Sequence, residues 1–352
     1  NIVADYCIRM VRGRVAAIPL VLGGIGLVFC SVGAGCIPMG AMLYPPAMLI
    51  AEKHKVNPSM MALVVGLIML AGEYSPIAMQ GAMFVGGYKN VGITGVSTRM
   101  FVDAIIIYCL VAICVYIYYG GLKLWKDTSI VDLNRLANES SLANEGEVTG
   151  VTKLGRNHII TLLGIVAFVI GAAVFQLHVG LWALTVGIVL SILKAGDEGE
   201  VIKNMPWFVV LLVCGVTLLV EVMKLTGGID LAVNGVAAIS SQFLLIPVMT
   251  FFGSLVGAFT SNMGVVLPTF IPMLTPAAEA VGGVNMQDLA TAFAVATSLP
   301  DVSPLSSLGA IGVASATAAM DKRKIFRDMI IYGLGITVVG TLITWLLVIT
   351  IL

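Results

Sequence analysis

One succession of residues occurs twice in this 352-residue chain. The first motif consists of a glycine–alanine pair, a methionine–glycine pair and a leucine. It occurs as Gly33-Ala34-x4-Met39-Gly40-x2-Leu43 and again as Gly257-Ala258-x4-Met263-Gly264-x2-Leu267. The second motif consists of an asparagine followed by an acidic residue and a serine–proline pair. It occurs as Asn57 with Glu73-Tyr74-Ser75-Pro76-x4-Gly81-Ala82 and again as Asn285 with Asp301-Val302-Ser303-Pro304-x4-Gly309-Ala310. Duplicated halves are typical of secondary transporters, whose substrate sites lie where the repeats meet.

The composition places this duplicated chain in a membrane. Apolar residues make up 59% of it, charged residues 11%, and the mean hydropathy is +1.04, whereas soluble domains carry about 25% charged residues. The apolar runs are long and unbroken, unlike the alternating segments of roughly ten residues in a β-barrel. We therefore expect an all-α polytopic membrane protein. The net charge of zero gives no case for a nucleic-acid partner, and no enzyme motif occurs, so we expect no enzymatic activity.

Two segments, at about 15–52 and about 239–280, each consist of two apolar arms around a break. The breaks are Gly33–Pro38 and Gly257–Asn262. Each arm is shorter than the roughly 20 residues that a spanning helix needs. The pattern predicts two re-entrant hairpins, which are tolerated only where they are buried in protein or face a cavity.

Two further segments are too long for one spanning helix. Residues 58–87 would extend about 45 Å at 1.5 Å per residue, against a hydrocarbon core of about 30 Å. This segment is interrupted by Ser75-Pro76, and its counterpart at 286–320 is interrupted by Ser303-Pro304. We predict two transmembrane helices that are broken near mid-depth.

These segments predict an inverted-repeat transporter. The first repeat covers 1–122 and ends with a helix at 100–122. A polar cytoplasmic linker covers 123–157, and the second repeat covers 158–352, with scaffold helices at 158–225 and a last helix at 328–350. Because the first repeat lacks counterparts of those scaffold helices, we expect about three helices, or about 70–80 residues, to precede it.

The basic residues favour one orientation. If the first hairpin opens to the cytoplasm, all but three of the 19 basic residues lie on the cytoplasmic side, as the positive-inside rule requires. The exceptions are Lys89, Arg99 and Lys224. The same orientation makes the second hairpin open outward, so the two repeats are inverted.

The pairs Ser75-Pro76 and Ser303-Pro304 are the sharpest candidates for a substrate site. Serine is a favoured N-cap and proline a favoured first helical residue, so each pair predicts the start of a half-helix inside the membrane. A helix start presents unpaired N–H groups and about half a positive charge, which suits an anion. Two such starts that converge from opposite faces suit a substrate with two carboxylates. The alternative is a proline kink in which serine satisfies the backbone.

Glu73 and Asp301 stand at matching positions, two residues before these pairs. Ionisable groups at this depth are expensive and are usually functional. They would relay protons, bind a coupling cation, or hold the unwound backbone, the last being a purely structural role. An acid beside an anionic substrate repels it unless it is protonated or neutralised, which favours co-transport with H⁺ or Na⁺.

The two hairpin breaks complete the candidate site. They supply small residues, backbone carbonyls and side-chain oxygens for substrate binding at Gly33, Ala34, Gly35, Cys36, Thr260, Ser261 and Asn262. Asn262 is also a candidate for ion coupling, and Na⁺ would bind near Ser261, Asn262 and Asp301. Packing roles remain open for these residues. We expect no cofactor other than Na⁺ as a coupling ion.

Several motifs together resemble those of the MatC-type malonate and C4-dicarboxylate carriers of the ion transporter superfamily, which also holds the divalent anion:sodium symporters. The motifs are Arg12-Gly-Arg14-x3-Ile18-Pro19, Gly33-Ala-Gly35, Asn57-Pro58, Ser75-Pro76-x4-Gly81 and Asp301-Val-Ser-Pro304. The resemblance covers nearly the whole chain. It implies paired scaffold and transport domains, commonly in a homodimer, with an elevator-like movement, and uptake of malonate or C4-dicarboxylates across a bacterial inner membrane.

The chain departs from the sodium symporters at the hairpin tips. In those proteins each tip bears a Ser-Asn-Thr motif, whereas here Ser261-Asn262 is followed by Met263 and the first tip reads Ile37-Pro38-Met39. This difference leaves proton coupling open beside sodium coupling. We therefore predict a secondary carrier for small dicarboxylates that is coupled to Na⁺ or H⁺. The alternative is a Na⁺/H⁺ antiporter or an oxyanion exporter of the same superfamily.

Overall fold

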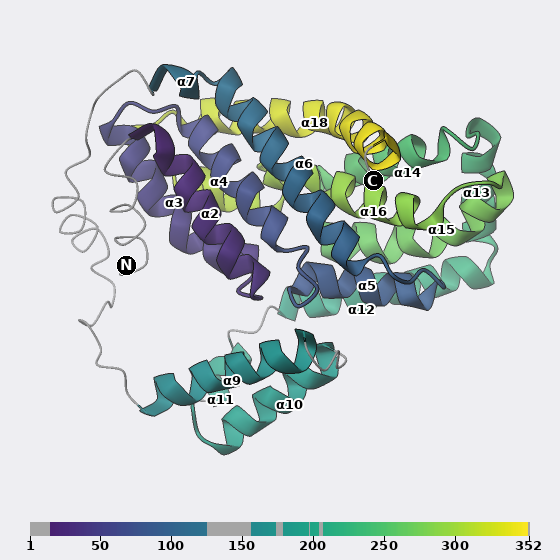
Figure 1. Cartoon of the computed structure of the whole chain (residues 1–352), viewed down its shortest axis with the longest axis horizontal. Coiled ribbons are helices and arrows are strands. Elements are labelled where there is room, and N and C mark those ends of the chain that lie inside the picture. The colour runs from purple at the N-terminus through teal and green to yellow at the C-terminus, as the bar shows by residue number, and fades with distance from the viewer. Residues whose placement is uncertain (1–14, 125–155, 174–178, 197, 204–206, 351–352) are drawn as a thin grey trace. The chain divides into compact units, whose positions relative to one another are not determined.

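The computed structural model describes residues 15–124, 156–173, 179–196, 198–203 and 207–350 (Figure 1). The motif residues Arg12 and Arg14 and nearly all of the predicted linker at 123–157 lie outside the described residues. The described part is helical and contains no strand. It divides into two compact units, which are considered one at a time: Asn134–Leu211, and Asn1–Leu133 together with Leu212–Leu352.

The smaller unit contains α9 (Arg156–Ala173), α10 (Val179–Ile192) and α11 (Glu198–Lys203), and α12 (Trp207–Leu225) begins in it. Helices α9 and α10 pack together, and Trp182 Nε1 donates to the Ala167 carbonyl at 3.2 Å. These helices occupy the range predicted for scaffold helices, 158–225. Their role as a scaffold remains a prediction.

The first half of the larger unit consists of η1 (Val15–Ala17), α2 (Ile18–Ser31), α3 (Cys36–Lys53), α4 (Pro58–Gly72), α5 (Met79–Asn90), α6 (Ser97–Tyr118) and α7 (Gly121–Leu124). Helices α2 and α3 are the arms of the predicted first hairpin and contact each other. Helices α4 and α5 are the pieces of the predicted broken helix at 58–87.

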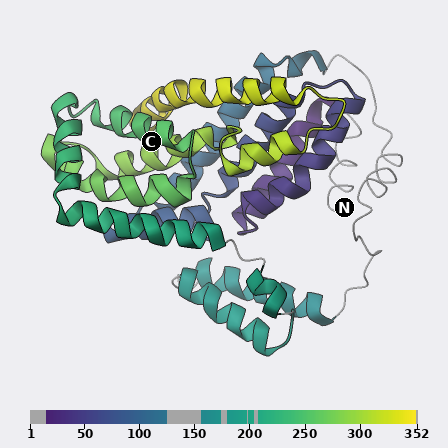
Figure 2. The ribbon, with the colours of Figure 1, turned by 180° about the vertical axis from the view of Figure 1, so that it is seen from behind.

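The second half repeats this order after α13 (Gly228–Ile239). It consists of α14 (Leu245–Gly257), the π-helix η2 (Asn262–Val266) with α15 (Leu267–Val281), α16 (Met286–Ser298), the 3₁₀-helix η3 (Leu299–Val302), α17 (Ser307–Ala314) and α18 (Lys322–Thr350). Figure 2 shows this half, green to yellow, from behind. The chain is interrupted at each predicted break, and α18 begins six residues before the predicted start at 328.

The two central helices, α4 and α16, hold equivalent places in the repeats. Every residue from Ser59 to Gly72 is buried, and so is every residue from Leu289 to Ser298. A helix that is apolar all round, as α4 is, lies in a protein core or in a membrane, and here both helices lie in the protein core. Each begins at an asparagine N-cap, where Asn57 accepts from the Ser59 and Met60 N–H groups and Asn285 accepts from the Gln287 N–H.

The long helices α6 and α18 flank these central helices (Figure 1). Outward apolar side chains recur along α6 at Val102, Ile106, Leu110, Ile113 and Ile117, as expected of a helix that faces lipid. Among the described residues, three helical segments are long and apolar enough to cross a membrane: Ser97–Tyr118, Asn262–Val281 and Lys322–Leu346. The prediction that each hairpin arm is too short to span is therefore wrong for Asn262–Val281, in which η2 and α15 run on without a break. The protein is thus a helical, multi-pass membrane protein.

The carboxyl end of α16 is stabilised by hydroxyl groups. Pro300 has no N–H to donate to the Ala296 carbonyl, which accepts instead from the Leu299 N–H and, at 2.9 Å, from Ser254 Oγ. Near this end the buried Tyr74 and Tyr108 hydroxyls donate to the Ala294 and Val295 carbonyls. Backbone groups inside a membrane protein need such partners, so these bonds allow the helix to end in the core.

Candidate functional site

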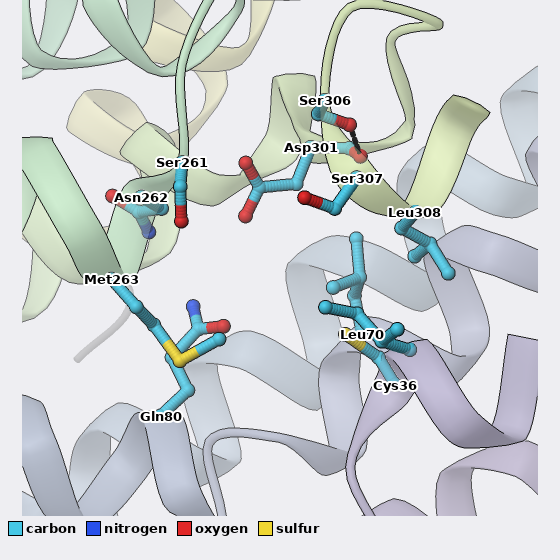
Figure 3. A pocket seen from close by; sticks show the side chains of 11 residues that line it. Cys36, Leu70, Gln80, Ser261, Asn262, Met263, Asp301, Ser306, Ser307 and Leu308 are labelled. Carbon is cyan, nitrogen blue, oxygen red and sulfur yellow. Dashed lines mark hydrogen bonds between the residues drawn. The ribbon is translucent and has the colours of Figure 1, made fainter. Parts of the chain in front are cut away.

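A small pocket lies where the interruptions of both halves meet (Figure 3). It is lined by Cys36, Ile37, Leu70, Gln80, Ser261, Asn262, Met263, Asp301, Ser306, Ser307 and Leu308. These residues come from the predicted hairpin tips and broken helices. The repeat therefore predicts the segments that build the pocket.

Four helix starts face this pocket. Cys36 is the first residue of α3, Gln80 the second of α5, Asn262 the first of η2 and Ser307 the first of α17. Each helix start carries about half a positive charge and unpaired N–H groups. The Glu73 carboxylate accepts from the Cys36 N–H at the start of α3, so the other three starts supply about one and a half positive charges. None of the 11 lining residues is a lysine, arginine or histidine. The backbone thus makes this pocket suited to an anion.

Asp301 is the carboxylate of the pocket. It lies on η3, is partly exposed, and points between Ser261 and Ser307 (Figure 3). Its backbone carbonyl accepts from Ser306 Oγ, but no described residue donates a hydrogen bond to its carboxylate. This carboxylate is available to a proton or a cation.

Glu73 is used differently. It caps the end of α4, is 1% exposed, and does not line the pocket. Its Oε1 accepts from the Cys36 backbone N–H at the start of α3, whereas Oε2 has no hydrogen-bond partner among the described residues. Glu73 therefore holds the first tip against the end of α4.

Gln80 joins the two halves by a bond to a serine that Asn262 also contacts. Both side-chain amides donate to Ser298 Oγ, Gln80 at 2.7 Å, and Gln80 Nε2 also donates to the Tyr74 hydroxyl at 3.1 Å. The buried Asn262 Oδ1 has no partner among the described residues. A buried polar atom without a partner is costly, so this oxygen is a candidate ligand for a cation or a hydrogen-bond donor.

The prediction that Ser75 and Ser303 cap the half-helices is wrong. Helices α5 and α17 begin at Met79 and Ser307, one turn later, with Ala78 and Ser306 as N-caps. Each serine–proline pair instead opens a turn. The Ser75 carbonyl accepts from the Ala78 N–H, and the Ser303 carbonyl from the Ser306 N–H, both at 3.0 Å. Proline favours the second position of such a turn.

The remaining predicted residues lie beside the pocket. Ser75, Pro76, Ser303, Pro304, Gly33, Ala34, Gly35 and Thr260 do not line it. Gly35, with φ +77°, is the N-cap of α3, and Thr260 Oγ1 donates to the Val256 carbonyl at 2.8 Å. The structure adds the apolar residues Ile37, Leu70, Met263 and Leu308. Of these, Ile37 and Met263 stand in the hairpin tips that the sequence singled out.

The pocket is too small for a carboxylic acid substrate in this conformation. Its space of about 30 Å³ accommodates roughly two water molecules. No group of three or more histidine, cysteine, aspartate or glutamate side chains in the described ranges is arranged to hold a metal ion. A cation here would bind the oxygens of Asp301, Asn262 and Ser261, donors that a hard cation accepts.

Interrupted helices whose starts meet at one pocket are typical of secondary transporters. The chain matches the model of the citrate transporter family (CitMHS) over residues 1–296, and it belongs to this family. None of the curated protein sequences matches it. The family lies in the ion transporter superfamily and implies a secondary carrier for citrate- or dicarboxylate-type anions. The MatC-type specificity expected above remains a prediction.

Proposed function

We propose that this protein takes up a small di- or tricarboxylate, such as citrate, malonate or a C4-dicarboxylate, across a bacterial inner membrane together with H⁺ or Na⁺. The convergence of four helix starts on one pocket carries the proposal. Backbone N–H groups recognise carboxylates without a basic side chain. Membership of the citrate transporter family supports the same class of substrate.

The charges of the pocket require a coupling ion. The three helix starts that Glu73 does not neutralise contribute about one and a half positive charges, and the Asp301 carboxylate opposes them. A substrate with two or three carboxylates leaves a negative excess in a region of low dielectric, which is costly. A proton on Asp301, or Na⁺ near Asp301, Asn262 and Ser261, removes that excess. Anion binding thereby depends on the cation, which is the basis of symport.

Transport requires this pocket to open to each side in turn. Helices α2–α3 and α14–α15 act as inverted re-entrant hairpins in this proposal, so one tip covers the pocket from each side of the membrane. The present pocket is too small for substrate, which corresponds to a closed state. The helices at 158–225 form a scaffold, and the carrier works as a homodimer.

Uptake of labelled citrate, malonate and succinate into proteoliposomes of the full-length protein tests the proposal, with Na⁺ and pH varied separately. We expect uptake of at least one of these anions that rises with one of the two cations. Asp301→Asn should abolish the cation dependence, because the amide binds neither ion as a carboxylate does. Glu73→Gln is the matched control, because it alters the equivalent acid outside the pocket. Normal coupled uptake by Asp301→Asn would refute the assignment of Asp301.

A cation exchanger is the second candidate, because Asp301 lines the pocket and no basic side chain does. A Na⁺/H⁺ antiporter would exchange cations in the same proteoliposomes without any added carboxylate. An oxyanion exporter would move its anion outward under the same conditions. Cation exchange that no carboxylate alters would replace the symport proposal.

A further inference from the structure

A second buried acid lies away from the pocket, where α6 of the first half meets α16 of the second. Arg99, in the first turn of α6, pairs its Nη2 with Asp288 Oδ1 at 2.6 Å, in the first turn of α16. Its Nε also lies 3.7 Å from Asp103 Oδ2, one turn further along α6. One guanidinium thus serves two carboxylates from different halves of the chain.

The two carboxylates have different surroundings. The Asp103 side chain is 0% exposed, whereas that of Asp288 is 20% exposed. Neither carboxylate oxygen of Asp103 has a hydrogen-bond partner among the described residues. A buried ionised carboxylate needs both a counter-charge and hydrogen bonds. The Asp103 carboxylate has only the Arg99 guanidinium near it, at the limit of ion-pair distance, and accepts no hydrogen bond from a described residue.

We propose that Asp103 is a second proton-binding residue, and that its proton decides whether Arg99 joins α6 to α16. With the proton on Asp103, one carboxylate and one guanidinium remain, and Arg99 pairs with Asp288 as the structure shows. When Asp103 loses the proton, its buried charge draws the guanidinium toward it. Asp288 is then released to water, which its partial exposure permits, and the contact between α6 and α16 loosens.

The charged groups around Asp103 fit this exchange. Arg99 on its own helix and Asp288 on α16 are the charged residues with an electrostatic effect on the Asp103 carboxyl. Of the other helices packed against α6, α4 has no charged residue, α5 carries Lys89, and α7 carries Lys123. The start of α18 carries the charged residues Lys322, Arg323, Lys324, Arg327 and Asp328.

The contact between α4 and α18 can be compared with the contact between α6 and α16, because the repeat makes the two contacts equivalent. There, α4 of the first half meets α18 of the second, and Ser59 Oγ donates to Asp328 Oδ2 at 3.0 Å. The buried and exposed positions of α6 recur along α18 at an offset of 229, so the position equivalent to Asp103 is Tyr332, which carries no charge. The long helix of each half therefore contacts the start of the central helix of the other, and one of these two contacts has a buried acid.

This proton-binding residue can be tested without any substrate. Infrared difference spectra of the full-length protein in lipid, between acidic and alkaline buffer, detect the C=O stretch of protonated carboxyl groups. We expect Asp103→Asn to lose one such band. Asp288→Asn should lose the same band, because Arg99 then neutralises Asp103. Asp328→Asn, the acid of the other contact, should retain it. These spectra do not depend on the proposed substrate, so they can fail or succeed separately from the uptake assay.

Uptake provides the second measurement once a substrate is known, with pH varied separately on each side of the membrane. We expect alkaline pH on the side of Arg99 to change the rate for the wild type and not for Asp103→Asn, because asparagine keeps Arg99 on Asp288. By the positive-inside rule that side is the outside. An unchanged carboxyl spectrum in Asp103→Asn, or a retained band in Asp288→Asn, would overturn the proposal.

Discussion

Gly81 offers the sharpest test of how the broken helix is built. The glycine lies in the first turn of α5, where its N–H donates to the Glu73 carbonyl across the break at 2.8 Å. A Cβ on this residue would lie 2.2 Å from the Ser75 carbonyl oxygen and 2.8 Å from that of Tyr74. Its counterpart Gly309 has the same constraint, with a Cβ 2.0 Å from the Ser303 carbonyl oxygen.

The size of the effect of Gly81→Ala follows from these contacts. The turn would have to move by about 1 Å to admit the methyl group, in a core that is close-packed. Such overpacking costs about 1–3 kcal/mol, and weakening the bond to the Glu73 carbonyl adds about 1 kcal/mol. Alanine recovers at most about 1 kcal/mol of helix propensity. We expect a net loss of stability of about 1–3 kcal/mol.

Gly86→Ala is the matched control, because Gly86 lies in the same helix and a Cβ there meets nothing within 4 Å. Apparent melting temperatures of the purified variants in one detergent, at one heating rate, measure the difference. Gly81→Ala should melt several degrees lower than Gly86→Ala, at about 2 °C or less per kcal/mol for a chain of this size. Equal melting temperatures for the two variants would refute the packing of the break against the Ser75 carbonyl.

Two further predictions concern the central helices. Asn57→Ala should lower the stability of the protein by about 1 kcal/mol. Asn285→Ala should lower it by less, because Asn57 caps two N–H groups whereas the exposed Asn285 caps one. Thermal denaturation of the two variants compares them directly. Tyr88→Phe should cost about 1 kcal/mol, because it removes the 2.6 Å bond to the Ala290 carbonyl. The control Tyr118→Phe, on a side chain 84% exposed, should leave the melting temperature unchanged, and equal losses in the two tyrosine variants would contradict this reasoning.

The order of elements was predictable because each break has a local cause. Glycine, proline and serine interrupt apolar runs at the same relative places in both halves, and each break identified in the sequence ends a helix in the structure. The exact helix starts were not predictable. A serine–proline pair fits the first two positions of a turn as well as an N-cap and first helical residue. The choice depends on the Gly81 N–H reaching the Glu73 carbonyl across the break.

The polar part of the pocket was predictable and its apolar part was not. Asp301, Ser261 and Asn262 are conspicuous in an apolar chain, and the structure brings them together. Leu70 and Leu308 carry no signal, because an apolar residue is unremarkable among so many. The contact between Arg99 and Asp288 joins residues from different halves. Neither periodicity nor local motifs report such a pairing.

The two acids of the repeat show how the duplicated halves have come to differ. Glu73 uses one carboxylate oxygen to accept from the Cys36 N–H and so neutralises the start of α3. Asp301, at the matching position, makes no such bond and points into the pocket. Glu73 does not line the pocket and is 1% exposed, so a proton or cation in the pocket does not reach it directly, whereas Asp301 can exchange either while the tips stay in place. We therefore expect coupling to depend on Asp301 and stability on Glu73, so that Glu73→Gln lowers the melting temperature but keeps the cation dependence of uptake. The reverse result would mean that release of the first tip from Glu73 is itself the coupled step.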